Sequence, residues 1–311
     1  MYIYKKGKRV EIWSPAKINL FLEILHRRMD GFHEIETLMV PIDLFDTLTG
    51  IADQGEAIDL TVSAGSDSSE ALPAVEDNLV YKALDLLRSD AGCKHGISVH
   101  LNKRIPSMAG LGGGSSDAAA ALVLGNSIWG LGYSNDRLVE LAAQLGSDVP
   151  FFLFGSTCVC RGRGEIISVV KRMPRMDFVI VRPAEGLSTA AVFRETTTSH
   201  SNKLKSIEPI IRLISTNRPH LLGNLLFNRL QAAATGLLPS IKRISDRLSR
   251  LDVLGHRMSG SGSTYFAVCR NRIHAQRIAK TLRSQGMGTA FAVSSAGLPN
   301  TNSLTYRPSQ N

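Results

Sequence analysis

The chain has 311 residues, a formal net charge of +9, 43% hydrophobic residues and 20% charged residues. This ordinary globular composition excludes a disordered or disulfide-stapled chain, and the length favours two domains. The sequence contains neither a secretory leader nor an apolar stretch of about 20 residues, so we expect a soluble, cytoplasmic protein with no membrane partner.

The first half of the chain mixes strand-like and helix-like segments. Alternating or continuous apolar residues predict strands at 16–24, 37–44, 58–62 and 97–101. A Ser/Gly/Asp-rich loop is expected at 64–74. Helical spacing predicts helices at 79–87, after a cap at Asp77 or Asn78, at 116–128, and at 135–145, ending at Gly146.

The second half begins with a strand-rich stretch at 152–170 and a buried strand at 178–181. Helices are expected at 207–215, 221–234, 241–251 and 273–284, and strands at 265–269 and 289–293. Since strands and helices mix without strict alternation, the predicted class is α+β. The predicted domains are 1–162 and 163–297, with a frayed polar tail at 298–311.

Cysteine and histidine spacing predicts no metal site and no disulfide. The four cysteines form no CxxC pair, and the eight histidines form no HExxH or HxH pattern. Cys158 and Cys160 lie in a strand-like stretch and are expected to be small buried apolar residues. This cysteine usage fits a reducing compartment.

Residues 106–122 read PSMAGLGGGSSDAAAAL, between a predicted strand and a predicted helix. Glycines let a backbone approach an anion closely, and the start of a helix offers unpaired N–H groups and the positive end of the helix dipole. Ser115 and Ser116 add hydroxyl groups there. Asp117 suits the dipole but would repel a phosphate, so its carboxylate is expected to point away from the anion.

Two common nucleotide-binding motifs do not fit this loop. A Walker A loop requires a lysine after its glycines, and none follows here. In the dinucleotide pattern GxGxxG, Gly110 and Gly112 match but Ser115 occupies the third glycine position. The loop therefore predicts a phosphate site of another kind rather than a flexible linker.

Three segments together resemble the GHMP kinase superfamily, which includes galactokinase, homoserine kinase and mevalonate kinase. They are SPAKINLFLEI at 14–24, the glycine loop, and MSGSGSTYFAV at 258–268. The resemblance implies a two-domain fold, with an N-terminal half like domain 2 of ribosomal protein S5 and a ferredoxin-like C-terminal half. It also implies ATP as phosphate donor, with Mg²⁺ arriving on ATP rather than at a dedicated protein site.

Further segments resemble one branch of this superfamily. They are RMDGFHEIETLM at 28–39, EDNLVYKAL at 76–84, LGSDVPFFLFG at 145–155 and GLSTAAVF at 186–193. The resemblance implies phosphorylation of the 2-hydroxyl of 4-diphosphocytidyl-2-C-methyl-D-erythritol, giving the 2-phosphate and ADP for isoprenoid precursors. The implied partner is thus a cytidine diphosphate-linked alcohol, handled by a monomer or homodimer without nucleic acid.

The resemblance also implies roles for individual residues. Lys17 would orient Asp148, and Asp148 would take the proton from the accepting hydroxyl. Read alone, Lys17 could lie on a solvated strand face, and Asp148 could cap a turn. The residues implied for ATP are Asn78, Lys103, Pro106, Gly110, Leu111, Gly112, Gly113, Gly114, Ser115 and Ser116. Lys103 could instead be a solvated charge at a strand end, and Asn78 a simple helix cap.

The implied acceptor-substrate residues are Asn19, Phe32, His33 and Phe193. In the family the histidine contacts the edge of cytosine, and two aromatic rings enclose the base. Phe32 stands where the family usually has tyrosine, so stacking is retained and a hydroxyl contact is lost. His33 and Phe193 could also be ordinary core residues.

Two rival functions remain open from the sequence. One is another small-alcohol kinase of the superfamily, of the homoserine or mevalonate type, which would have no use for the cytosine residues. The other is an RNA-binding module, which the charge of +9 would suit. Because the basic residues are scattered and no role would remain for Asp148, the kinase function is favoured.

Overall fold

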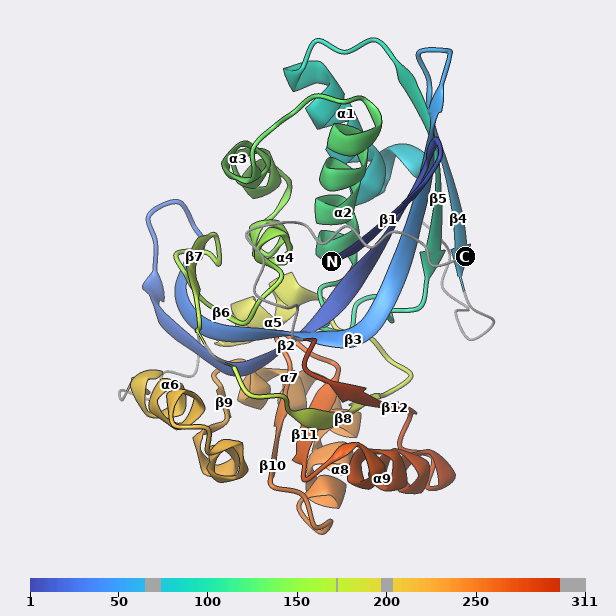
Figure 1. The fold of residues 1–311 in the computed structure, drawn as a ribbon. Coiled ribbons are helices and arrows are strands. Elements are labelled where there is room, and N and C mark those ends of the chain that lie inside the picture. The colour runs from blue at the N-terminus through green and yellow to red at the C-terminus, as the bar shows by residue number, and fades with distance from the viewer. Residues whose placement is uncertain (65–73, 172, 197–203, 297–311) are drawn as a thin grey trace.

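The computed structural model describes residues 1–64, 74–171, 173–196 and 204–296 (Figure 1). The predicted loop at 65–73 and the predicted tail at 298–311 lie outside the described residues. Both strands and helices occur in each half of the chain, and the predicted α+β class is confirmed. No helix among the described residues is long and apolar enough to cross a membrane.

Two β-sheets organise the described residues, and Figure 1 shows them in the upper and lower parts of the molecule. The central path of the first sheet runs β1-β2-β3-β5-β4, while β6 pairs with β3, β7 with β6, and β9 with β2. Its strands are β1 (Tyr2–Lys6), β2 (Arg9–Arg27), β3 (His33–Asp53), β4 (Ile58–Ala64), β5 (Gly96–Lys103), β6 (Cys158–Arg161), β7 (Ile166–Val169) and β9 (Phe227–Asn228).

The second sheet is antiparallel and runs β10-β11-β8-β12. Its strands are β10 (Gly255–Met258), β11 (Tyr265–Cys269), β8 (Asp177–Arg182) and β12 (Thr289–Ser294). In Figure 1, α1 to α4 lie with the first sheet and α6, α8 and α9 with the second. The α-helices are α1 (Leu79–Asp90), α2 (Gly113–Ile128), α3 (Asn135–Leu145), α4 (Val149–Phe154), α5 (Thr189–Thr196), α6 (Glu208–Ser215), α7 (Gln231–Leu237), α8 (Pro239–Leu248) and α9 (Arg272–Ser284).

The long strand β2 is buried on both of its faces near its middle. Ala16, Ile18 and Leu20 belong to a core cluster that includes Phe178 and Phe266 of the second sheet. The intervening residues Lys17 and Asn19 are also buried and point to the other face, because successive side chains of a strand alternate. β2 therefore presents two polar side chains at a point where both sheets meet.

Helix α2 is the central helix of the first half and is buried on all sides from Ser116 to Gly125. Its alanine run, 118–121, has no exposed surface. Alanine favours the helix and its small side chain permits close packing against the neighbouring sheet and helices. Its N-terminus is held against β2, since the Ser14 hydroxyl donates a hydrogen bond to Asp117 near the start of the helix.

Two predicted elements are wrong. Residues 152–154 belong to helix α4 rather than a strand, since Pro150 fits the first turn of a helix and Gly155, at φ 61°, ends it. The helix predicted at 221–234 is instead a 3-10 helix (Pro219–Leu225), the short strand β9 and helix α7. Asn228 interrupts the helical run because its side-chain amide donates to the Met258 and Gly260 carbonyls, both at 2.8 Å.

The domain limits at 162/163 and 297/298 stay predictions. The first limit falls in the turn between β6 and β7, two strands that pair with each other next to β3. Cys158 and Cys160 on β6 are fully buried and free, as expected. Burial raises the pKa of the Cys158 thiol to about 12, so it stays protonated and unreactive near neutral pH.

Candidate functional site

The glycine loop passes from β5 into the start of α2. Gly110 and Gly112 have φ angles of +71° and +72°, a conformation that side chains with a Cβ rarely adopt. A Cβ on Gly110 would lie 2.3 Å from the Ser259 carbonyl oxygen, and one on Gly112 would lie 2.9 Å from the Phe152 ring. The loop therefore fits closely between α4 and the turn after β10, and glycine is required at both positions.

The first turn of α2 offers backbone N–H groups to the space beside the loop. Gly112 occupies the cap position and no side chain caps the helix. The first N–H groups of a helix have no partner within it, and the dipole adds about half a positive charge at this end. Gly113, Gly114 and Ser115 face an open cleft, so this helix start can bind an anion such as a phosphate.

A buried cluster of charges holds the base of the loop. Lys103, at the end of β5, forms ion pairs with Asp46 of β3 and Asp117 of α2. Asp46 also accepts hydrogen bonds from the backbone N–H groups of Arg104 and Ile105, and the Ser14 hydroxyl donates to Asp117 at 2.8 Å. The carboxylate of Asp117 is thus bound by Lys103 and Ser14. Asp117 also lines the cleft, so its orientation away from the anion stays a prediction.

Two carboxylates share one cation in this cluster, and both are almost fully buried. Burial raises the pKa of Asp117 to about 7, and the charge of Asp46 adds to the rise against the opposing influence of Lys103. For Lys103, burial opposes the charge, but Asp117 and Asp46 together raise its pKa. Lys103 therefore stays protonated and bridges β3, β5 and α2, while its contact with ATP stays a prediction.

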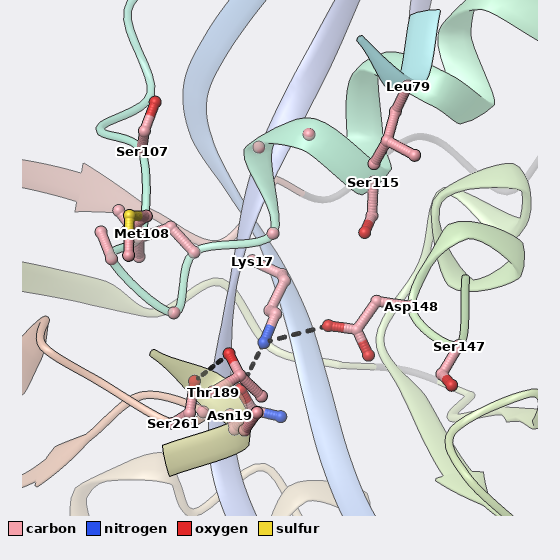
Figure 2. Close-up of a pocket in the computed structure, with 18 of the residues that line it drawn as sticks. Lys17, Asn19, Leu79, Ser107, Met108, Ser115, Ser147, Asp148, Thr189 and Ser261 are labelled. Carbon is pink, nitrogen blue, oxygen red and sulfur yellow. Dashed lines mark hydrogen bonds and ion pairs between the residues drawn. The ribbon is translucent and has the colours of Figure 1, made fainter. Parts of the chain in front are cut away.

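Lys17 and Asp148 face each other across the cleft (Figure 2). The Lys17 Nζ lies 3.4 Å from Asp148 Oδ2 and donates to the Asn19 side chain at 2.8 Å. The Lys17 side chain is 5% exposed and that of Asp148 is 34% exposed. The buried ammonium holds this partly open carboxylate in the cleft, where a bound molecule could give it a proton.

Asn19 connects this pair to the turn after β10. Its amide donates to the Thr37 hydroxyl at 2.8 Å, and its backbone N–H donates to the Ser259 hydroxyl at 3.3 Å. Ser259 in turn donates to the Gly110 carbonyl at 3.1 Å. Lys17 is therefore oriented by an amide whose own position depends on the glycine loop and on the second sheet.

Aromatic side chains line the end of the cleft formed by the start of β3 and helix α5. His33 stacks on Phe193, with ring centroids 5.3 Å apart and an interplanar angle of 30°. Phe32 is half exposed, and the guanidinium carbon of Arg163 lies 4.8 Å from its ring centroid. The arrangement offers one exposed ring and one polar ring edge, which suits a flat heteroaromatic ligand.

The cleft has a volume of about 1070 Å³, enough for two nucleotide-sized ligands, and Figure 2 shows its middle. Among the residues expected at the site, one set lines this cleft. It consists of Lys17, Asn19, Phe32, His33, Asn78, Lys103, Pro106, Gly110, Leu111, Gly112, Gly113, Gly114, Ser115, Asp148 and Phe193. Asn78 also caps α1, because its side chain accepts a hydrogen bond from the Val80 N–H at 2.9 Å.

Ser116 differs from the other expected residues. Its side chain is fully buried and lies outside the lining of the cleft. The helical period explains this placement, because one residue beyond Ser115 the side chain points about 100° further around α2, into the core. A contact between Ser116 and ATP stays a prediction, and it would have to be made by the Ser116 backbone because the side chain is buried.

Some residues of the site were not expected from the sequence. Thr189 and Ser261 line the cleft and share a hydrogen bond of 2.8 Å between their hydroxyl groups, as Figure 2 shows. Arg163 lines it from the turn between β6 and β7. The motifs GLST and SGSGS could have drawn attention to the two hydroxyls, but nothing in the sequence links Arg163 to Phe32.

Comparisons with known proteins agree with this geometry. The family model of the GHMP kinases N terminal domain matches residues 78–156, and that of the GHMP kinases C terminal domain matches residues 210–287. A protein of Pelotomaculum thermopropionicum named 4-diphosphocytidyl-2-C-methyl-D-erythritol kinase is 40% identical over 270 residues, covering 87% of this chain and 92% of the relative. A protein of the same name from Shouchella clausii is 37% identical over 277 residues, or 88% of this chain and 91% of the relative.

Solved structures give the same result. A crystal structure of 4-(cytidine 5'-diphospho)-2C-methyl-D-erythritol kinase matches with a TM-score of 0.77 at 33% identity, covering 92% of this chain and 99% of the other. Mevalonate kinase of L. major matches with a TM-score of 0.73 at 15% identity, covering 94% and 96%. At that identity, the likeness to mevalonate kinase concerns the fold alone.

Proposed function

This chain belongs to the 4-diphosphocytidyl-2-C-methyl-D-erythritol kinases of the GHMP kinase family, and we propose from this premise how its cleft divides between two substrates. The enzyme uses ATP to phosphorylate the 2-hydroxyl of 4-diphosphocytidyl-2-C-methyl-D-erythritol, giving the 2-phosphate and ADP for isoprenoid synthesis. The phosphates of ATP bind at the start of α2, and the cytidine binds at the aromatic end.

The observation that carries this proposal is the Lys17–Asp148 pair, whose atoms are 3.4 Å apart in the cleft that the glycine loop also lines. Asp148 takes the proton of the 2-hydroxyl while the hydroxyl oxygen attacks the γ-phosphorus of ATP. The bond between the γ-phosphorus and the oxygen that bridges it to the β-phosphate breaks, and ADP is released. Such base assistance contributes about 10²–10⁴-fold to the rate. Lys17 orients Asp148 through their ion pair and draws the acceptor oxygen toward the phosphate.

The start of α2 supplies the second contribution. Phosphoryl transfer depends mainly on positioning and on stabilising the charge of the transferred group. The N–H groups of Gly113, Gly114 and Ser115 are fixed by a helix that is buried beyond its first turn, so they need no rearrangement as the charge develops. Gly112 allows this close approach because it lacks a Cβ.

Magnesium suits the same place as a companion of ATP. Mg²⁺ prefers oxygen ligands and commonly uses one or two protein oxygens with substrate phosphates and water. No group of three or more His, Cys, Asp or Glu side chains that could hold a metal ion occurs among the described residues. The Ser115 hydroxyl at the start of α2 is the protein oxygen that fits, and the ion would neutralise phosphate charge there.

The aromatic end would select the acceptor. Phe32 offers an exposed face for stacking on cytosine, and His33 offers ring nitrogens toward its polar edge. The contact between His33 and Phe193 orients the imidazole, since stacked rings restrict each other's rotation. Phe193 therefore supports the cytosine site in two ways, by orienting His33 and by its own ring surface.

The test is ADP release coupled to product identification, with ATP and Mg²⁺ and with the cytidyl alcohol, homoserine or mevalonate in parallel. Turnover is expected with the cytidyl alcohol alone. Asp148→Asn should lose at least about 10²-fold in kcat while the KM for ATP changes little. Asp136→Asn, an exposed aspartate at the start of α3, is the matched control and should keep normal kcat. Near-normal turnover of Asp148→Asn would refute the role of Asp148 as the general base.

A further inference from the structure

The turn between β6 and β7, residues 162–165, lies beside Asp148. A Cβ on Gly164 would be 3.4 Å from the Ser147 carbonyl oxygen and 3.6 Å from Asp148 Oδ1. The turn is closed by a hydrogen bond from the Gly164 N–H to the Arg161 carbonyl at 3.0 Å. The residue that precedes Gly164 is therefore held close to the catalytic carboxylate.

That residue, Arg163, extends from the turn to the aromatic end of the cleft. Its guanidinium carbon lies 4.8 Å from the ring centroid of Phe32, and its side chain lines the cleft with 31% exposure. Among the described residues, the carboxylate within ion-pair distance of this guanidinium is Glu165, at 3.8 Å from Nε. That separation leaves the hydrogen-bond donors of Arg163 available to a ligand.

Arg163 thus places a positive charge on the ring proposed to stack on cytosine. The turn that carries it also approaches the carboxylate proposed to deprotonate the 2-hydroxyl. In the acceptor substrate a diphosphate joins the cytidine to the methylerythritol, and its two phosphates carry negative charge. The part of the substrate between the cytidine and the methylerythritol is therefore anionic.

We propose that Arg163 is a specificity-determining residue that binds the diphosphate of the acceptor substrate. This inference rests on the function proposed above. A guanidinium suits the task because its face can stay on the Phe32 ring while its edge donates to phosphate oxygens. The phosphates of ATP are not its ligand, since its guanidinium lies on Phe32 and the turn that carries it approaches the Ser147–Asp148 segment rather than the glycine loop.

The experiment is isothermal titration of the full-length protein with cytidine diphosphate and, separately, with cytidine. Arg163→Gln is expected to raise the Kd for cytidine diphosphate by about 10- to 100-fold, as loss of a hydrogen bond to a charged group does. The Kd for cytidine should rise by at most about 5-fold, because only the contact with the Phe32 ring is lost. Arg163→Lys should recover part of the preference for the diphosphate, and the KM for ATP should not change.

Arg161→Gln is the matched control, because Arg161 precedes the same turn but pairs with Glu36 at 2.9 Å and does not line the cleft. It should retain the wild-type preference for cytidine diphosphate over cytidine. Equal weakening of both ligands by Arg163→Gln, or no weakening, would overturn the inference while leaving the kinase function intact. Failure of the wild-type protein to bind cytidine diphosphate or to phosphorylate the cytidyl alcohol would overturn the proposed function itself.

Discussion

Replacing Lys103 with methionine tests whether this lysine is part of the scaffold or a ligand of ATP. The change keeps an extended side chain but removes the single cation between Asp46 and Asp117, whose side chains are 0% and 2% exposed. Removing one partner of a buried ion pair leaves an uncompensated charge and costs about 3–5 kcal/mol. Asp46 then loses its ammonium partner, and Asp117, whose pKa is about 7 even with Lys103 present, must take up a proton, so we expect a loss of unfolding free energy within that range at pH 8.

Urea unfolding followed by circular dichroism measures this loss. The double variant Lys103→Met with Asp117→Asn removes the cost of protonating Asp117 at pH 8 and should recover part of the loss. Lys242→Met, which breaks the exposed pair with Asp246, is the control and should change the free energy of unfolding by about 0.5 kcal/mol or less. A loss below about 1 kcal/mol for Lys103→Met, together with a large rise in the KM for ATP, would refute the structural role.

Three further changes test other parts of the site. Gly110→Ala should abolish turnover and lower the melting temperature, because its Cβ would lie 2.3 Å from the Ser259 carbonyl; a normal melting curve would show that the loop is not packed as described. Burial raises the pKa of Asp117 to about 7, so the contribution of Asp117 to the free energy of unfolding should be greatest below about pH 4 and should decline up to about pH 7. Urea unfolding of the wild type and of Asp117→Asn over this pH range should show the decline as a difference that shrinks by up to about 1.4 kcal/mol per pH unit. Phe32→Ala should raise the KM for the cytidyl alcohol by about 5- to 150-fold without changing that for ATP, and a rise for ATP instead would mean that the two ligand sites are reversed.

Periodic sequence patterns predicted most of the fold, because the spacing of apolar residues follows the local geometry of a strand or a helix. The strand over 16–24 lies within β2, and the helices at 135–145 and 273–284 correspond closely to α3 and α9. Prediction failed at 152–154, where a short apolar run is compatible with either a strand or a helix. There the capping residues Pro150 and Gly155 decided the outcome, and they carry more information than apolar content alone.

The candidate site was predictable where a motif is contiguous and less so where it is assembled from distant segments. The glycine loop and the residues around Asp148 were found because each lies in one short segment. Asp46 could not be linked to Lys103, which is 57 residues away, and neither could Arg163 to Phe32. Such contacts depend on the register between β3, β5 and β6, which local sequence does not specify.

The turn at 258–264 links the two halves of the chain at the proposed catalytic site. Ser259, 240 residues from Asn19, bonds to the Asn19 backbone and to the Gly110 carbonyl, while Asn228 holds the turn that carries it. Asn19 accepts the hydrogen bond that directs Lys17 toward Asp148. A shift of the second sheet against β2 would therefore change the glycine loop and the catalytic pair together, since they share these contacts. Conversely, a substitution in the second half that moves the 258–264 turn should lower kcat without touching either substrate.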